Sequence, residues 1–266
     1  MELSIIIVNY QSKKHLLLCL ASINRFLYTQ NSTFKNDFEV ILVNNENTPL
    51  KIPTMYSFIN PKIIEVGKNV GFGVAANLGT IMANGKYILF INPDIIFSDS
   101  SLNKALKYLD KHPSVGALGL SIINKQRKIP ENWSCGKHST WGNILFRNTI
   151  NKPWNKKIPQ EVDWSSGAGL IIRKNIFRQI KGFDKNFFMY FEDQDICLRI
   201  KKETNKKIIY YPPTKIIHFN GQSWNNKKEQ KRNYQKSQLY FFKKHNTKLG
   251  YSILKIILKI NTLFSK

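Results

Sequence analysis

The feature that most constrains the fold is the alternation of short apolar runs with amphipathic stretches along the chain. A short run without polar alternation is typical of a strand buried on both faces, and apolar residues three or four positions apart are typical of a covering helix. Together they predict an α/β fold with a mostly parallel central sheet flanked by helices. In the helix at 72–83, we expect Val74, Leu78 and Ile81 to face the sheet. We predict strands at residues 4–9, 38–43, 63–66, 87–91, 115–120 and 168–173, and helices at 12–27, 72–83, 101–111 and 174–180. The segment 124–160 has little periodicity and is predicted to be a long loop.

Polar residues directly follow three of the predicted strands. In open sheets of parallel strands, ligands bind beyond the carboxyl ends of the strands. These polar residues are therefore expected to lie at one ligand-binding edge. They are Asn9 and Tyr10 after the first strand, Asn44 and Asn45 after the second, and Asn92 and Asp94 after the fourth.

The charge balance restricts the partners of the chain. The 266 residues include 41 Lys and Arg against 17 Asp and Glu, a formal charge of +24. This excess favours anionic partners, which are nucleic acid, phosphorylated small molecules or an anionic membrane surface. The three cysteines are too few for a disulfide framework or a cysteine-rich zinc site, so we expect reduced thiols in a cytoplasmic chain. The apolar run Leu3–Val8 is far shorter than the roughly 20 residues of a membrane span and is predicted to be the first strand.

The sequence Asn92-Pro93-Asp94 places a carboxylate at the end of a buried strand. A carboxylate there can hold Mg²⁺ or Mn²⁺, and the ion would neutralise the charge of a diphosphate. The alternative is an ordinary turn, because Asn, Pro and Asp all favour turns.

Three carboxylates, Glu192, Asp193 and Asp195, follow the aromatic run 187–191. A carboxylate beside apolar rings is suited to act as a general base, since reduced solvation raises its proton affinity. The alternative is an acidic first turn of a helix, stabilised by the helix dipole, in which Asp195 and Arg199 form an i,i+4 ion pair.

Three weaker motifs complete the candidate site. The small residues of 164–169 would let a substrate approach the backbone closely. His218 follows an apolar pair and is either a metal ligand or a structural histidine. The Gly-rich turn at 69–73, followed by Asn77, lacks the spacing of a dinucleotide fingerprint or a P-loop, but helix-start amides there can face a phosphate or ribose.

In this order, these motifs resemble the family 2 glycosyltransferases of the GT-A fold, and among them the rhamnosyltransferase-like branch. The similarity covers residues 2–245. The segments that carry it are Ile7–Tyr10, Val40–Asn45, Asn69–Phe72 with Asn77, Phe90–Asp94, Asp163–Ala168, Gly182–Asp184 and Phe187–Arg199.

The resemblance implies a metal-dependent inverting transfer of a sugar, with Asp193 as the base assisted by Glu192. It further implies Mg²⁺ or Mn²⁺ at Asp94, with His218 as a second metal ligand. We expect dTDP-rhamnose or a UDP-sugar as donor, and a saccharide acceptor carried on a lipid diphosphate in cell-surface polysaccharide synthesis. The expected nucleotide-sugar-binding residues are Val8, Asn9, Tyr10, Asn44, Asn45, Gly71, Asn77, Asn92 and Asp94, and the expected acceptor-binding residues are Trp164, Gly167, Tyr190 and Asp195.

Two positions depart from the family pattern. The family usually has Asp where this chain has Asn44, and Asn brings no charge to the nucleotide. The acidic metal motif also carries a single carboxylate, so water and phosphate oxygens would complete the coordination. These departures keep open a catalytically idle homologue that acts as a scaffold.

The chain is predicted to end in a basic amphipathic helix at 246–266, after a catalytic domain at 1–245. A Lys-lined helix can lie in an anionic leaflet, which would place the protein at the inner face of the plasma membrane. The alternative is packing on the domain or on a second subunit in a homodimer. A nucleic-acid-binding protein, the rival class, would lack these clustered acids in its groove. The polar stripe that makes the C-terminal helix amphipathic consists of Lys244, Lys248, Ser252, Lys255, Lys259, Thr262 and Lys266.

Overall fold

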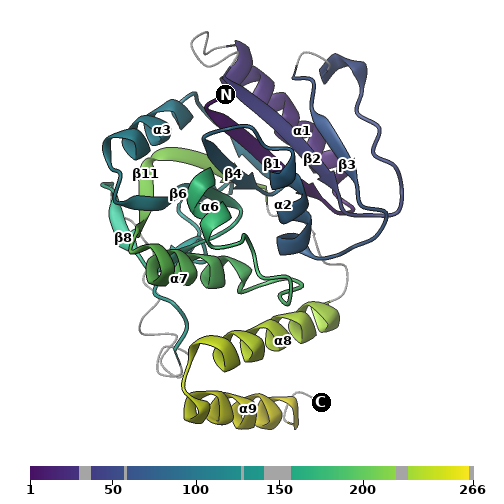
Figure 1. Cartoon of the computed structure of the whole chain (residues 1–266). Coiled ribbons are helices and arrows are strands. Elements are labelled where there is room, and N and C mark those ends of the chain that lie inside the picture. The colour runs from purple at the N-terminus through teal and green to yellow at the C-terminus, as the bar shows by residue number, and fades with distance from the viewer. Residues whose placement is uncertain (30–36, 57–58, 127–128, 141–156, 220–226, 264–266) are drawn as a thin grey trace.

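The computed structural model describes residues 1–29, 37–56, 59–126, 129–140, 157–219 and 227–263. In this part of the chain, a nine-stranded sheet has the strand order β3-β2-β1-β4-β10-β6-β11-β5, with β8 paired to β11 (Figure 1). Its strands are β1 Leu3–Asn9, β2 Phe38–Asn44, β3 Lys62–Glu65, β4 Tyr87–Ile91, β5 Ile95–Phe97, β6 Val115–Asn124, β8 Gln160–Val162, β10 Gly169–Arg173 and β11 Lys207–His218. The short strands β7 Cys135–Gly136 and β9 Trp164–Ser165 form a second, two-stranded sheet.

Helices cover both faces of the sheet and extend the chain beyond it (Figure 1). They are α1 Lys13–Ile23, α2 Phe72–Ile81, α3 Leu102–Lys111, α6 Lys174–Gln179, α7 Glu192–Thr204, α8 Lys227–His245 and α9 Lys248–Leu263. A π-helical turn at Asn24–Thr29 and a 3₁₀ turn at Thr54–Tyr56 complete the list. The predicted α/β fold is confirmed. The long loop predicted at 124–160 contains β7, and its residues 127–128 and 141–156 lie outside the described part.

The sheet is parallel in its first half and mixed in its second. The strand β1 runs parallel to β2 and β4, and β2 runs parallel to β3. The strand β10 is antiparallel to both of its neighbours, β4 and β6. The last long strand, β11, is parallel to β6 and has an irregular register between Tyr211 and Lys215. Pro212 and Pro213 fall within that irregularity because they have no N–H to donate to the ladder.

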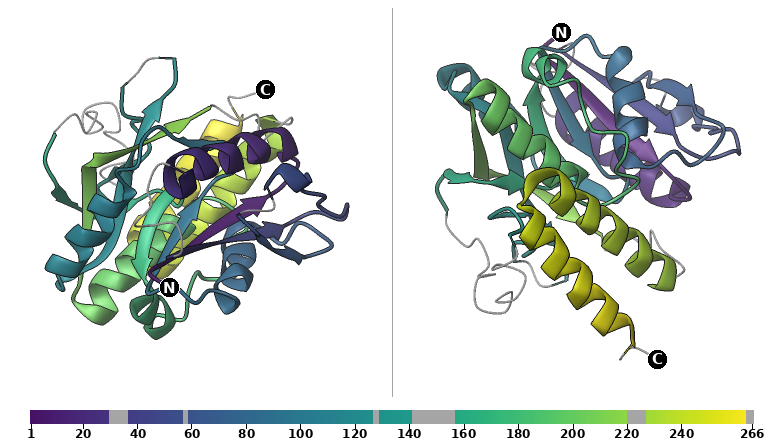
Figure 2. Two further views of the ribbon diagram at one scale, coloured as in Figure 1. Left: turned by 90° about the horizontal axis from the view of Figure 1, so that it is seen from above. Right: turned by 60° about the horizontal axis from the view of Figure 1, so that its bottom comes forward.

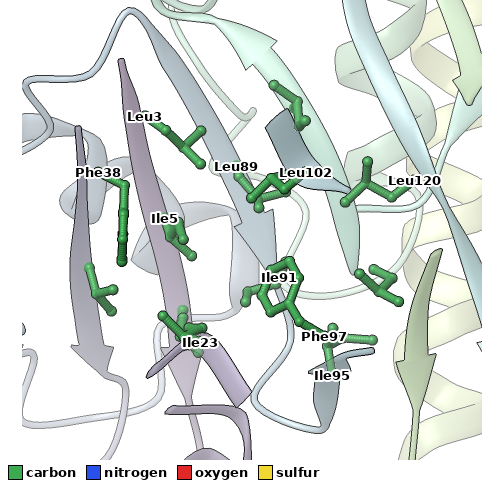
Figure 3. Packing of buried hydrophobic residues seen from close by; sticks show 14 of the residues in the cluster. Leu3, Ile5, Ile23, Phe38, Leu89, Ile91, Ile95, Phe97, Leu102 and Leu120 are labelled. Carbon is green, nitrogen blue, oxygen red and sulfur yellow. The ribbon is translucent and has the colours of Figure 1, made fainter. Parts of the chain in front are cut away.

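Two hydrophobic clusters lie on opposite faces of the sheet because side chains of a strand alternate in direction. Leu3, Ile5 and Ile7 of β1 join the cluster that packs against α1 and α3 (Figure 3). Ile6 and Val8 join the cluster under α2, α6 and α7. This two-sided burial explains why the β1 sequence is continuously apolar.

The inner face of α2 consists of small residues, which corrects the predicted orientation of the helix. Ile81, expected to face the sheet, is 78% exposed. Gly73, Ala75, Ala76 and Gly79 are buried instead. A Cβ on Gly79 would lie 2.7 Å from Cγ2 of Ile6, so this face must stay small for the helix to approach the sheet closely.

A third cluster joins the C-terminal helices to the domain. It contains Phe187 and Phe191 from the segment before α7, Phe241 and Phe242 from α8, and Leu254 from α9. The two helices lie side by side at one end of the molecule (Figure 2). The predicted boundary at 245 falls between them. Among the described helices, none combines the length and the hydropathy that a membrane crossing requires.

Candidate active site

The polar ends of β1 and β2 meet because the two strands are parallel and Asn9 is in register with Asn44. Both side chains are fully buried. The amide Nδ2 of Asn9 donates to Oδ1 of Asn44 at 2.9 Å and to Oε1 of Glu46 at 2.8 Å. The Oδ1 atom of Asn9 is buried without a hydrogen-bond partner among the described residues. An unpaired buried acceptor is rare in proteins, so Asn9 remains a candidate ligand-binding residue.

The environment of Asn44 explains why an amide replaces the expected carboxylate. Its Nδ2 donates to Oε2 of Glu65 at 2.6 Å and to the carbonyl oxygen of Thr48 at 2.7 Å. An aspartate at this position would direct a second negative charge at Glu65. In this chain, the charge at the edge is supplied by Glu46 and Glu65.

Asn45 connects the end of β2 to the Gly-rich turn before α2. Its Oδ1 accepts from the N–H of Val70 at 3.0 Å, and its Nδ2 donates to Oδ1 of Asn69 at 3.0 Å. Gly71 has a φ of +85°, and a Cβ there would overlap the carbonyl oxygen of Phe188. The turn thus requires glycine, and it brings the nucleotide-binding candidates to the segment that precedes α7.

Asp94 and His218 are brought together by the pairing of β5 with β11, in which Ile95 is in register with His218. Oδ2 of Asp94 lies 3.2 Å from Nε2 of His218, and the other ring nitrogen lies 3.6 Å from Oε1 of Glu131. The ring of Trp133 packs edge-on against the imidazole, with centroids 5.1 Å apart.

The donor set at Asp94 and His218 fits a divalent ion that takes further oxygens from a ligand. One carboxylate oxygen and one imidazole nitrogen suit Mn²⁺ better than Mg²⁺, which prefers oxygen ligands throughout. Within the described residues, no group of three or more His, Cys, Asp or Glu side chains could hold a metal alone. Diphosphate and water oxygens would therefore have to complete the coordination.

The carboxylates of Glu192 and Asp193 open α7 in an environment that favours their protonated forms. Burial, reinforced by the neighbouring negative charge of Asp193, raises the pKa of Glu192 to about 8. Burial also raises the pKa of Asp193 to about 6, although backbone N–H groups of Gln194 and Gly167 oppose the rise. Oε2 of Glu192 is buried without a hydrogen-bond partner in the described part of the chain. Asp193 remains partly exposed, so it is the carboxylate that a substrate can reach.

The carboxylates at 94 and 193 lie at the same edge of the sheet. Gly169, at the start of β10, is in register with Ile91, at the end of β4. Two residues before Gly169, the backbone N–H of Gly167 hydrogen-bonds to Asp193. Three residues after Ile91 comes Asp94. Because only a few residues separate each carboxylate from this strand pair, the two halves of the predicted site converge.

The sequence matches the family model of glycosyl transferase family 2 over residues 4–181, more than half of the chain. The chain belongs to glycosyl transferase family 2. The transferase is 27% identical over 250 residues to the N-acetylglucosaminyl-diphospho-decaprenol L-rhamnosyltransferase of Mycobacterium tuberculosis, covering 83% of this chain and 77% of the relative. It is 32% identical over 146 residues to the rhamnosyltransferase WbbL of Escherichia coli, covering 52% and 53%.

Solved structures confirm the GT-A fold of the transferase. GalNAc-T7, solved with UDP, GalNAc and Mn²⁺, aligns with a TM-score of 0.64 at 14% identity, covering 91% of this chain and half (50%) of that one. Staphylococcus aureus TarS 1-349 in complex with UDP aligns with a TM-score of 0.59 at 16% identity, covering 96% and 68%. The mannosyltransferase of Pyrobaculum calidifontis, in complex with GDP-Man and Mn²⁺, also has a TM-score of 0.59, at 14% identity, covering 91% and 63%.

Asp195, an expected acceptor-binding residue, is occupied by ion pairs inside the protein. The side chain is fully buried. It accepts from Arg199 Nε at 2.8 Å and lies 2.6 Å from His245 Nε2 and 2.7 Å from Lys244 Nζ. Burial alone would raise the pKa of Asp195, but His245, Arg199 and Lys244 together lower it. The i,i+4 pair with Arg199 is confirmed, and Asp195 fastens α8 to α7.

Other predicted residues have varied surroundings. Asn77 hydrogen-bonds the backbone of Phe183 with both amide atoms, at 2.8 and 2.9 Å, so its side chain holds a turn. The indole N–H of Trp164 donates to the carbonyl oxygen of Lys137 at 3.0 Å. Val8 is buried, whereas Tyr10, Asn92, Tyr190 and Trp164 are half-buried at or near the same edge.

Several residues of the site were missed at the level of sequence. Glu46 lies in the loop after β2, Glu65 is the last residue of β3, and Glu131 lies in the region predicted to be a loop. A lone glutamate there gives no local signal, because its role comes from partners on other strands. For example, Nδ2 of Asn124, at the end of β6, donates to Oε1 of Glu131 at 2.8 Å.

Replacing Asp195 with Asn should destabilise the fold at neutral pH by about 3 kcal/mol or more, since it leaves buried cations without their counter-charge. The lowered pKa means that ionised Asp195 stabilises the fold above its ordinary value of 3.8 and loses this effect as the pH falls through the lower folded value. Urea unfolding should therefore show a large deficit at pH 7 that narrows as the pH approaches about 3. The exposed Glu203→Gln on the same helix should stay within about 0.5 kcal/mol of wild type. A deficit independent of pH would contradict this account.

Proposed function

We propose that this family 2 transferase moves a sugar from a nucleotide-sugar to a hydroxyl of a saccharide acceptor by a single inverting displacement. The observation that carries the proposal is the convergence of three groups at one edge of the sheet. These are the amides at the ends of β1 and β2, the pair Asp94 and His218, and the carboxylate of Asp193.

The donor is proposed to lie along the ends of β1, β2 and β4. The free acceptor atom of Asn9 and the carboxylate of Glu46 suit the N–H groups of a nucleobase. Asp94 and His218 would hold a divalent ion, and the bound ion would neutralise charge on the departing diphosphate. GalNAc-T7, a structural neighbour that was solved with UDP and Mn²⁺, supports this arrangement.

Asp193 is proposed to take the proton from the acceptor hydroxyl. A raised pKa makes its carboxylate a stronger base than an ordinary aspartate, while the residue stays largely ionised at neutral pH. Glu192 beside it, with a higher pKa, holds its proton and so spares Asp193 a second neighbouring charge. Gly167, expected to bind the acceptor, contacts Asp193 through its N–H.

The relatives support rhamnose as the transferred sugar and a lipid diphosphate as the acceptor carrier. The mycobacterial relative is, by its name, an L-rhamnosyltransferase that acts on N-acetylglucosaminyl-diphospho-decaprenol. We therefore take dTDP-rhamnose as the donor. A UDP-sugar is the second candidate, because TarS is a structural neighbour that binds UDP and UDP-GlcNAc.

The helix α9 is proposed to rest on an anionic membrane. Leu254 is buried against α8, so packing uses one face of the helix. On the opposite face, Leu249 and Ile256 are 71% and 58% exposed. The exposed Lys248, Lys255 and Lys259 border them. An apolar stripe beside a row of lysines is the composition that suits the interface of an anionic leaflet.

Replacing Asp193 with Asn should lower the rate of transfer by about 10²- to 10⁴-fold, the usual contribution of a general base. Affinity for dTDP and the melting temperature should stay close to wild type. The wild-type rate should rise with pH through about 6, as Asp193 loses its proton, and this rise should vanish in the variant. An active variant that keeps the pH profile would refute the assignment.

A thermal-shift panel of dTDP, UDP and GDP, each with and without Mn²⁺, tests the donor. A ligand at 100 times its Kd stabilises the native state by about 2.7 kcal/mol. We expect the largest shift with dTDP and Mn²⁺, and loss of the Mn²⁺-dependent part in Asp94→Ala. Asp99→Ala, an exposed acid outside the site, is the matched control. A larger shift with UDP would favour a UDP-sugar, and no shift with any nucleotide would favour the scaffold.

Flotation with phosphatidylglycerol vesicles tests the role of α9. Reversing Lys248, Lys255 and Lys259 to Glu should weaken binding by about 100-fold or more, since each lysine contributes about 1 kcal/mol. The matched control reverses Arg232, Lys236 and Lys243 on the exposed side of α8. Equal binding of the two triple variants would contradict the proposal. A wild-type protein that does not bind the vesicles would also contradict it.

A further inference from the structure

The two residues that precede the catalytic carboxylates have an unfavourable backbone conformation. Tyr190 and Phe191 have φ values of 69° and 66°, in the left-handed region that non-glycine residues seldom occupy. Glu192 and Asp193 follow directly. Such a conformation persists only where the surroundings hold it, and it concentrates at functional sites.

The helix α8 supplies the groups that hold this turn. The hydroxyl of Ser237, which is 5% exposed, donates to the carbonyl oxygen of Met189 at 2.6 Å. The ring of Tyr234 packs against both Tyr190 and Phe191, with centroids 5.5 and 5.2 Å away. The side-chain amide of Gln230 donates to the hydroxyl of Tyr190 at 3.0 Å. Phe191 is also in contact with Phe241, at 5.4 Å between centroids.

The same helix also contacts the chain on the C-terminal side of Asp193. Its last residues, Lys244 and His245, pair with the buried carboxylate of Asp195. Asp193 therefore lies between two attachment points on α8, one at 189–191 and one at 195. On the opposite side, the N–H of Phe72 donates to the carbonyl oxygen of Phe188 at 3.0 Å.

We propose that Ser237 and Tyr234 are positioning residues that aim the carboxylate of Asp193 by holding the left-handed turn at 190–191. This inference rests on the proposed role of Asp193 as the base. The contacts of α8 described above are with residues 189–195, whereas the donor candidates Asn9, Asn44 and Asp94 lie at or just after the ends of β1, β2 and β4. A displaced turn should therefore slow the chemical step while donor binding stays intact.

Ser237→Ala should lower kcat for release of dTDP from dTDP-rhamnose, with a synthetic N-acetylglucosaminyl diphosphate lipid as acceptor, by about 10-fold or more. A misplacement of about 1 Å can cost about 100-fold. The KM for dTDP-rhamnose should change little. Water that reaches the loosened turn should lower the pKa of Asp193, so the acid limb of the pH profile should move to lower pH. Ser237→Thr should retain the wild-type values, and so should the neighbouring exposed Lys236→Ala.

Hydrogen exchange of the peptide 187–195 gives a readout that does not depend on the donor. We expect faster exchange in Ser237→Ala within this peptide, with unchanged protection of β1 and β4. If the wild type releases no nucleotide, the proposed function is refuted, and hydrogen exchange alone tests whether α8 holds the turn at 190–191. Unchanged exchange, or a lower melting temperature with unaltered kcat and pH profile, would overturn the proposal. Should Ser237→Ala fail to fold, the exposed Gln230→Ala is expected to show the same changes on a smaller scale.

Discussion

The site depends on the hydrogen-bonded pairing of β10 with β4. Because β10 runs antiparallel, its first residue, Gly169, lies beside Ile91, the last residue of β4. The small residues before β10 are therefore delivered to the edge that carries Asp94. The fit is tight, since a Cβ on Gly169 would lie 2.6 Å from Cδ1 of Ile216. Through this pairing, the N–H of Gly167 reaches Asp193 at the edge where β4 ends.

Two carboxylates on the same turn of α7 have opposite electrostatic environments. Asp195 faces Arg199, Lys244 and His245, and these groups keep its pKa low despite complete burial. Asp193 faces backbone N–H groups and apolar surroundings, and burial raises its pKa. The first carboxylate is thereby committed to holding the fold, and the second remains available for a proton. Burial without a cation distinguishes the proposed base from the carboxylate that holds the fold.

The C-terminal helices join this chemistry to the outer surface of the protein. The helix α8 contacts the turn before Asp193 through Ser237, and Asp195 through His245. The helix α9 packs on α8 through Leu254 and leaves Leu249 and Ile256 exposed. An element that resembles an appendage in the sequence is therefore in direct contact with the residues on both sides of Asp193.

The sequence by itself determined the parallel half of the sheet and the helices that cover it, and it suggested the candidate residues of the site. Continuous apolar runs such as β1 can be predicted from the sequence because a strand that is buried on both faces has a local pattern. The order of the motifs indicated the family, and the resemblance singled out Asp94, Asp193 and His218 as candidates. Only the tertiary structure decided the direction of β10, the burial of Asp195 and the exposure of Ile81. It also decided which residues Ser237 and Glu65 contact. These depend on partners distant in the chain, and the local sequence around a residue does not reveal such a partner.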